Sequence, residues 1–388
     1  MSDWITAKLK EVAKVVTGKT PQTSNSEYYG GDIPFVSPAD LNEGILSETK
    51  TYLTSSGADQ VYRVPKNTVL VSCIGNLGKL AITSKEVCFN QQINGLIFDE
   101  QKIFPKYGFY FAQTLKPQLE KASSSTTLPI INKSRFSDLE IKYPPLAEQR
   151  RIASILDQAD ELRQKRQQAI EKLDQLLQAT FIDMFGDPEQ NPKKWNKVIL
   201  GDICDAKDRV NYGVVQPGND FEGGIPLIRV GDIDGGILSF TSIKTIDPKI
   251  EKDYSRSRLK GNEILVSCVG SIGTIAKVPN KAIGFNIARA ITRVPLQDKR
   301  IINFVAECLK TEAIQNYFKK NTRTVSQPTL NVSFVKETEI IFPNEEKILD
   351  FCKIVDKVEF QKELLQKALV MQESLFQSLQ NQAFSGTL

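Results

Sequence analysis

The chain has 388 residues, with 50 Lys and Arg against 46 Asp and Glu, a formal net charge of +4, and 40% hydrophobic residues. This is typical of a globular chain with room for two or three domains, and no apolar run approaches the roughly 20 residues that a membrane helix needs. The absence of histidine excludes Ser–His–Asp and Cys–His catalysis. The six cysteines form no CxxC pair, so we expect no metal site and interpret them as buried, reduced thiols of a cytoplasmic protein.

Several segments occur twice, in the same order, about 195 positions apart. The matching pairs are GGDIPFVSPADLNEGIL (30–46) with EGGIPLIRVGDIDGGIL (222–238), VSCIGNLGKLAI (71–82) with VSCVGSIGTIAK (266–277), and LPIINKSRFSDLEIKYP (128–144) with QPTLNVSFVKETEIIFP (327–343). Because the offset drifts by only a few residues, we interpret the chain as a tandem duplication. The period is too long for a solenoid and corresponds to one domain with an appendage.

Each half begins with about 145 residues of mixed, β-rich character. Short β-branched runs such as NTVLVSCI (67–74) are bounded by Gly, Asn or Pro and predict strands. A helical stretch follows in each half, at 107–122 and at 301–320. The half then ends in a long helix, 148–185 or 345–384, in which apolar or small residues recur at spacings of three and four. Gly186 predicts a C-cap for the first of these helices.

A helix of about 36 residues is roughly 54 Å long. Its outer face is too polar for the interior of a domain, so we expect its apolar seam to pair with another helix. We therefore expect an α+β fold in which two mixed α/β domains, related by pseudo-twofold symmetry, are separated by two long antiparallel helices that form a coiled coil. Two unpaired helices on separate domains are the alternative. The expected parts are a first domain (1–145), a first long helix (146–188), a second domain (189–343) and a second long helix (344–388).

No catalytic motif survives inspection. TGKT (17–20) would need a glycine at Ala13 to form a phosphate-binding loop, and the ExK-like Glu140-Ile141-Lys142 loses its lysine in the repeat. The paired glycines of VSCIGNLG and VSCVGSIG favour tight hairpin turns over a phosphate cradle, although a turn tip can also contact a ligand.

A polar segment recurs in both halves, at 121–136 and 319–334, rich in Ser, Thr and Asn with interspersed Lys and Arg. Hydroxyls, amides and cations are the groups that contact phosphates and base edges. An ordinary surface loop is the alternative interpretation. Because the segment recurs at equivalent positions of both halves, we give a DNA contact the same weight as an ordinary surface loop.

Residues 143–188, YPPLAEQRRIASILDQADELRQKRQQAIEKLDQLLQATFIDMFGDP, resemble the central conserved region of the specificity (S) subunits of Type I restriction–modification systems. Other segments are similar to parts of that family's target-recognition domains, and the resemblance covers essentially the whole chain: IPFVSPADL, IPLIRVGDI, TGKTPQ, FNQQINGLIF, FNIARAITRV, STTLPIINKSRF and SQPTLNVSFVK. The second long helix departs from the pattern, because it opens with PNEEKILDFC in place of AEQRRI, and KDRVNYGVV replaces TGKTP in the second domain.

The resemblance implies a DNA sequence-specificity subunit without catalytic activity. Each domain would bind one half of a bipartite, asymmetric double-stranded DNA target, and the helices would set the spacer and dock the methyltransferase subunits. The implied partners are two methyltransferase (M) and two restriction (R) subunits, with no membrane. The chain itself would hold no cofactor, because S-adenosylmethionine, ATP and Mg²⁺ would be bound by those partners.

The candidate DNA-binding residues are Lys19, Thr20, Ser124, Ser125, Thr126, Thr127, Lys133, Arg135, Lys319, Lys320, Arg323, Thr324, Ser326 and Gln327. The candidate subunit-interface residues are Arg150, Arg151, Arg163 and Arg166. A solvated charged face is the alternative for these four arginines. Two other functions compete with DNA recognition: a fused nuclease or methyltransferase, which needs a catalytic motif, and a coiled-coil adaptor that binds no DNA.

Overall fold

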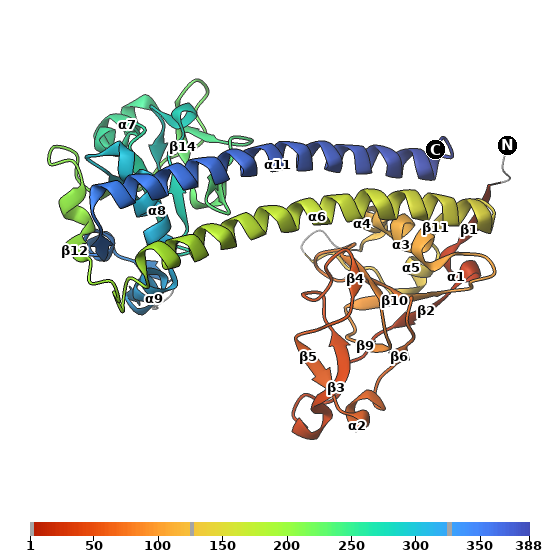
Figure 1. Cartoon of the computed structure of the whole chain (residues 1–388). Coiled ribbons are helices and arrows are strands. Elements are labelled where there is room, and N and C mark those ends of the chain that lie inside the picture. The colour runs from red at the N-terminus through yellow and green to blue at the C-terminus, as the bar shows by residue number, and fades with distance from the viewer. Residues whose placement is uncertain (1–3, 125–127, 324–327) are drawn as a thin grey trace. The chain divides into compact units, whose positions relative to one another are not determined.

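The computed structural model describes residues 4–124, 128–323 and 328–388 (Figure 1). The chain divides into two compact units, of which unit 1 contains Met1–Arg166 and Ala368–Leu388, and unit 2 contains Gln167–Lys367. The long helices α6 (Leu146–Phe185) and α11 (Glu345–Ser385) therefore contribute one part to each unit. Each unit combines a mixed α/β domain with parts of two long helices, as the duplication predicts.

The described part of unit 1 forms three sheets. They are the antiparallel pair β1 (Ile5–Lys8) and β11 (Glu140–Tyr143); the five strands β2 (Ala13–Thr17), β10 (Ile93–Phe98), β7 (Val69–Ser72), β8 (Leu80–Thr83) and β4 (Ile45–Leu46); and the four strands β5 (Thr51–Leu53), β3 (Tyr29–Val36), β9 (Val87–Phe89) and β6 (Arg63–Val64). The helices are α1 (Leu9–Val12), α2 (Ser55–Ala58), α3 (Pro105–Gln113), α4 (Lys116–Ala122) and α5 (Lys133–Ser137). Every residue of β7 and β8 is buried, because both faces of this hairpin are covered.

Unit 2 repeats this plan with mostly shorter strands. Its sheets are β12 (Asn196–Ile199) with β24 (Glu339–Phe342); β13 (Asn211–Tyr212), β21 (Ile291–Pro295), β18 (Glu263–Ser267) and β19 (Ile275–Lys277); β17 (Lys244–Ile246), β14 (Ile225–Ile228) and β20 (Asn286–Ile287); β15 (Ile233–Asp234) with β16 (Ile237–Leu238); and β22 (Thr322–Arg323) with β23 (Thr329–Leu330). The helices are α7 (Pro248–Asp253), α8 (Ile302–Lys310), α9 (Glu312–Lys320) and α10 (Val332–Lys336). The hairpin β18–β19 corresponds to β7–β8, since both follow the repeated NxxLVS pattern.

Each expected helical stretch consists of two helices. In unit 1, Pro117 is the second residue of α4 and has no N–H to donate to the carbonyl of Gln113, so α3 cannot continue into α4. In unit 2, Thr311 adopts an extended conformation between α8 and α9.

The long helices run antiparallel within each unit. In unit 1, Arg166 Nε on α6 donates to Gln372 Oε1 on α11 at 2.9 Å, and the ring of Phe384 on α11 packs 5.4 Å from that of Tyr107. In unit 2, Lys362 on α11 forms an ion pair with Asp174 on α6. The first part of each helix thus pairs with the last part of the other.

Aromatic residues join the end of α6 to the domain of unit 2. The rings of Phe181 and Phe185 lie 5.6 and 5.4 Å from that of Phe351 on α11, and both also contact Phe304 on α8. All four are fully buried. The helix then ends as expected at Gly186, whose φ of 81° provides the left-handed cap.

Gln149 of the AEQ motif fastens the start of α6 to unit 1. Its side chain is fully buried, its Oε1 accepts from the Phe104 N–H at 2.8 Å, and its Nε2 donates to the carbonyls of Lys102 and Pro144, both at 2.8 Å. At the equivalent position of α11 stands Ile348, which is buried in an apolar cluster. The motif is therefore missing from the second helix because that position packs against apolar neighbours.

We expect Gln149→Ala to lower the free energy of unfolding of unit 1 by about 1–3 kcal/mol, because buried amide and carbonyl groups lose their partner. Trp4 lies in unit 1 and Trp195 in unit 2, so the fluorescence of a Trp195→Phe background reports urea unfolding of unit 1 alone. The matched control is Gln158→Ala on the exposed face of the same helix. Equal losses for the two variants would contradict the role assigned to Gln149.

Candidate nucleic-acid interface

A glycine turn ends the buried hairpin of each unit. Gly75 and Gly78 have φ values of 75° and 82°, and Gly270 and Gly273 have 76° and 84°, a region that disfavours residues with a Cβ. In unit 1 the Ser72 hydroxyl, at the start of the turn, donates to a carbonyl inside it at 2.7 Å. The expectation of a tight turn is confirmed in both units.

The polar segment of each unit is hydrogen-bonded to this glycine turn. In unit 1, Gly75 N–H donates to the carbonyl of Pro129 and Ile131 N–H to that of Cys73, both at 2.9 Å. In unit 2, Leu330 N–H donates to the carbonyl of Cys268, also at 2.9 Å. We call residues 73–78 with 128–131, and 268–273 with 328–331, the turn–loop assemblies. Two motifs that are about 55 residues apart in sequence thus form one surface in each unit.

Five of the candidates in unit 1 are described, and among them Ser124 is hydrogen-bonded to the turn–loop assembly. Lys19 and Lys133 are exposed, and the latter opens α5 behind the cap residue Asn132, whose Oδ1 accepts from a helix N–H at 2.9 Å. The Arg135 guanidinium donates to the carbonyl of Ala122 at 3.1 Å. The remaining described candidates are Thr20, whose hydroxyl donates to Gln91 Oε1 at 2.6 Å, and Ser124, whose hydroxyl donates to Ile130 O at 3.2 Å. Ser125, Thr126 and Thr127 lie outside the described residues.

Two residues of unit 1 that sequence reasoning missed lie near Lys133. The Lys14 ammonium is 5.2 Å from the centre of the exposed Tyr62 ring. Interaction with Lys14, and to a smaller extent with Lys133, lowers the pKa of Tyr62. Cations beside an exposed aromatic ring suit phosphate contact and base stacking. The sequence carries only a weak signal for Lys14, which is the one charged residue of the otherwise uncharged strand β2, AKVVT.

In unit 2 the exposed Lys319 and Lys320 occupy the last turn of α9, where the helix dipole favours cations. Arg323 is exposed on β22. None of the three belongs to an ion pair within the described residues. Thr324, Ser326 and Gln327 lie outside the described part of the chain.

The four arginines proposed from the sequence as a subunit interface all have partners inside unit 1. Arg151 forms an ion pair with Glu148 at 2.7 Å, and Arg163 pairs with Asp160 at 2.7 Å while lying 5.0 Å from the ring centre of Phe376. Arg166 is the half-buried contact to α11 described above. Arg150 is exposed and lies 5.6 Å from the ring centre of Phe104.

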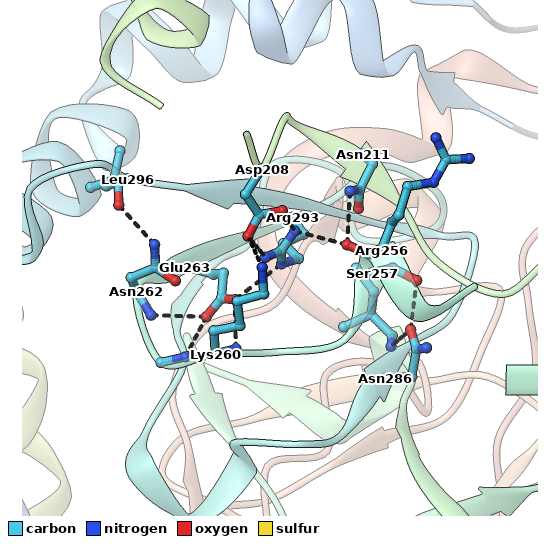
Figure 2. A network of polar contacts seen from close by, with 12 residues as sticks. Asp208, Asn211, Arg256, Ser257, Lys260, Asn262, Glu263, Asn286, Arg293 and Leu296 are labelled. Atoms are coloured by element: carbon cyan, nitrogen blue, oxygen red, sulfur yellow. Dashed lines mark hydrogen bonds and ion pairs between the residues drawn. The ribbon is translucent and has the colours of Figure 1, made fainter. Parts of the chain in front are cut away.

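A buried ion cluster supports β13 and β21 in unit 2. Figure 2 shows the Arg293 guanidinium between the carboxylates of Asp208 and Glu263. Arg293 and Glu263 are fully buried and 3.0 Å apart, and Arg293 Nη1 lies 2.6 Å from Asp208 Oδ1. Burial alone would raise the pKa of Asp208, but hydrogen bonds from Arg293 and Lys260 hold that pKa below its ordinary value. In unit 1 the β-sheet register places Gly95 and Thr68 where Arg293 and Glu263 stand.

The described residues carry no sign of a metal centre or a reactive thiol. No group of three or more potential ligands is close enough to hold a metal ion among them. All six cysteines are free and buried, and burial raises the pKa of Cys73 to about 12. Within the same residues, no helix is both long and apolar enough to cross a membrane.

Comparison with known proteins identifies the family. The model of the Type I restriction modification DNA specificity domain matches residues 1–172 and 192–369. The EcoBI specificity subunit of Escherichia coli is 26% identical over 99% of this chain and 86% of its own length. The MjaIX specificity subunit of Methanocaldococcus jannaschii is 27% identical over 91% of this chain and 86% of its own length.

Solved structures show the same fold. The S subunit from M. genitalium has a TM-score of 0.55 at 16% identity, over 99% of this chain and 96% of that one. A chain from a study of complex assembly and conformational transition of the type I restriction–modification system has a TM-score of 0.52 at 17% identity, over 99% and 98%.

These matches define a DNA-specificity protein with two tandem recognition domains, one in each unit. The chain belongs to the Type I restriction modification DNA specificity family and is a specificity subunit of a Type I restriction–modification system. The resemblance seen in residues 143–188 is thereby confirmed, and the coiled-coil adaptor without DNA recognition is not favoured.

Proposed function

We propose that each recognition domain binds one half of a bipartite, asymmetric DNA target through its turn–loop assembly. The observation that carries this proposal is the construction of the same assembly twice, with different side chains on a shared backbone pattern in which the N–H of Ile131 or Leu330 donates to the cysteine carbonyl of the glycine turn. A repeated scaffold with divergent side chains suits two domains that read different half-sites. Lys and Arg would contact phosphates and set affinity, whereas hydroxyls and amides would read base edges.

The long helices would set the spacer between the half-sites and dock two methyltransferase subunits, with two restriction subunits in the complete complex. Arg150 is the strongest of the four candidate interface arginines, because it is exposed and forms no ion pair within the described residues. The subunit would be non-catalytic and would act in the cytoplasm. Its partners would bind S-adenosylmethionine, ATP and Mg²⁺.

The test compares methylomes of one host strain that carries this gene with its neighbouring methyltransferase gene, and of a second strain that lacks only this gene. We expect N6-methyladenine in a single split motif in the first strain and its complete loss in the second. The motif would also give the two half-sites and the spacer. Unchanged methylation in the presence of expressed methyltransferase would overturn the proposed function.

A further inference from the structure

The two recognition domains carry different side chains at one equivalent position beside the turn–loop assembly. In unit 1 the Cys73 N–H donates to the carbonyl of Gln92 at 2.8 Å. In unit 2 the Cys268 N–H, at the equivalent position, donates to the carbonyl of Ala290 at 2.7 Å. The preceding residues, Gln91 and Arg289, are therefore equivalent. This hydrogen-bond register, which the sequence repeat alone does not provide, makes the comparison possible.

The neighbour of this position also differs between the units. Gln91 Oε1 accepts from the hydroxyl of Thr20 at 2.6 Å. The backbone pairing that positions Thr20 places Val215 at the same point of unit 2. Because the valine side chain has no polar atom, Arg289 has no such partner, and its exposed guanidinium forms no ion pair or hydrogen bond with any described residue.

Arg289 lines a cavity of about 770 Å³ at the turn–loop assembly of unit 2. The cavity is also lined by Tyr212, Val215, Val269 and Asn331. The base of the arginine is held in place, since its N–H donates to the carbonyl of Val214 at 2.8 Å. An anchored backbone with a free side chain in a partly apolar recess suits recognition of a base edge.

The eight arginines of unit 2 fall into two groups. Arg229, Arg258, Arg293 and Arg300 form ion pairs with carboxylates. Arg209, Arg256, Arg289 and Arg323 form none with the described residues, and the first two line an adjoining cavity of about 610 Å³ that shares Tyr212 and Val332 with the first. These four arginines thus lie at the assembly or beside it, since Arg323 is on β22, which pairs with β23 of the assembly.

We propose that Arg289 is a specificity-determining residue of the second domain and reads a guanine in its half-site, an inference that rests on the proposed function. A guanidinium can donate two parallel hydrogen bonds to guanine O6 and N7 in the major groove, and no other base offers two acceptors there. Arg209 and Arg256 would supply the neighbouring phosphate contacts. The first domain, with Gln91 hydrogen-bonded to Thr20, would read its half-site differently.

The test is the methylome of strains that carry the methyltransferase gene with either the wild-type subunit or Arg289→Ala. We expect one guanine position in one half of the split motif to become degenerate, while the other half stays unchanged. With duplexes that carry the wild-type motif or a substitution at that position, discrimination by the purified complex should fall about 5- to 150-fold, the range for one bidentate arginine–guanine contact. Arg289→Lys keeps the charge and should still lose most of the discrimination.

Arg300→Ala is the matched control, because it removes an exposed arginine of the same unit that is engaged with Asp298 and Glu345. It should leave the motif intact. An unchanged motif in Arg289→Ala would overturn the inference, as would a uniform fall in methylation without a relaxed position, which would make Arg289 a phosphate contact. Failure of the proposed function is separate, since it would appear as a wild-type strain without any split motif.

Discussion

Replacing Arg293 with alanine is expected to destabilise unit 2 by about 3–5 kcal/mol, because it leaves the buried Glu263 carboxylate without its cation, whereas Asp208 keeps its ion pair with Lys260. Glu263 has no exposed surface, and Asp208 is 8% exposed. Glu263 would retain backbone donors, including the Gly261 N–H at 2.7 Å, but these do not neutralise its charge. The cost therefore arises mainly from the charge left behind and not from the lost side-chain volume.

The measurement is urea unfolding followed by Trp195 fluorescence in a Trp4→Phe background, with Arg300→Ala as the exposed control. The pH dependence provides a second readout. The pKa of Asp208 is lowered in the folded state, so its contribution to stability is present above its ordinary pKa of about 3.8 and is lost as pH falls through the folded value. The difference between wild type and Arg293→Ala should therefore narrow below about pH 4.

A double-mutant cycle separates the ion cluster from packing. Glu263→Gln combined with Arg293→Met should cost less than the sum of the two single changes, since neither charge then stays buried alone. Strict additivity, or a loss below about 1 kcal/mol for Arg293→Ala, would show that water reaches the cluster and screens its charges.

Neutralising Lys319, Lys320 and Arg323 together is expected to weaken DNA binding by the assembled complex and to reduce its salt dependence. Removing one phosphate-binding cation should lower the slope of log K against log salt concentration by about 1. The triple alanine variant should therefore show a slope smaller by about 3, with no change in the preferred sequence. Binding of a duplex with the methylated motif, titrated with salt, measures both quantities.

The control removes the same formal charge from Lys299, Arg300 and Lys353, which are exposed in unit 2 and lie outside the turn–loop assembly. Its salt slope should match that of wild type. Equal slopes for both triple variants would mean that the end of α9 does not contact the DNA backbone.

The repeat made much of the fold predictable. Hydrophobic periodicity over long segments predicts helices reliably, and α6 and α11 begin within a residue or two of the expected positions, after Pro145 and Pro343. The prediction of one helical stretch in each half was less accurate, because Pro117 and the extended Thr311 each divide the expected stretch into two helices. The sequence indicates a break of this kind at a proline, but it does not indicate one at a threonine.

The candidate site was predictable at the level of segments and not of single contacts. Glycine turns and polar segments were both evident, but their union depends on main-chain hydrogen bonds such as that from Gly75 to Pro129. Side-chain identity carries no information about a backbone pairing of that range. Tyr62, Lys14 and Arg289 were missed for the same reason, since each gains meaning only from its spatial neighbours.

The sequence by itself determined the duplication, the two long helices, the family and the absence of histidine chemistry, because these depend on composition, periodicity and motif order. Only the tertiary structure decided which residues meet: Gln149 with the segment before α3, Arg293 with two buried carboxylates, and the polar segments with the glycine turns. Such contacts follow from hydrogen-bond geometry and desolvation across distant parts of the chain, which no local pattern encodes.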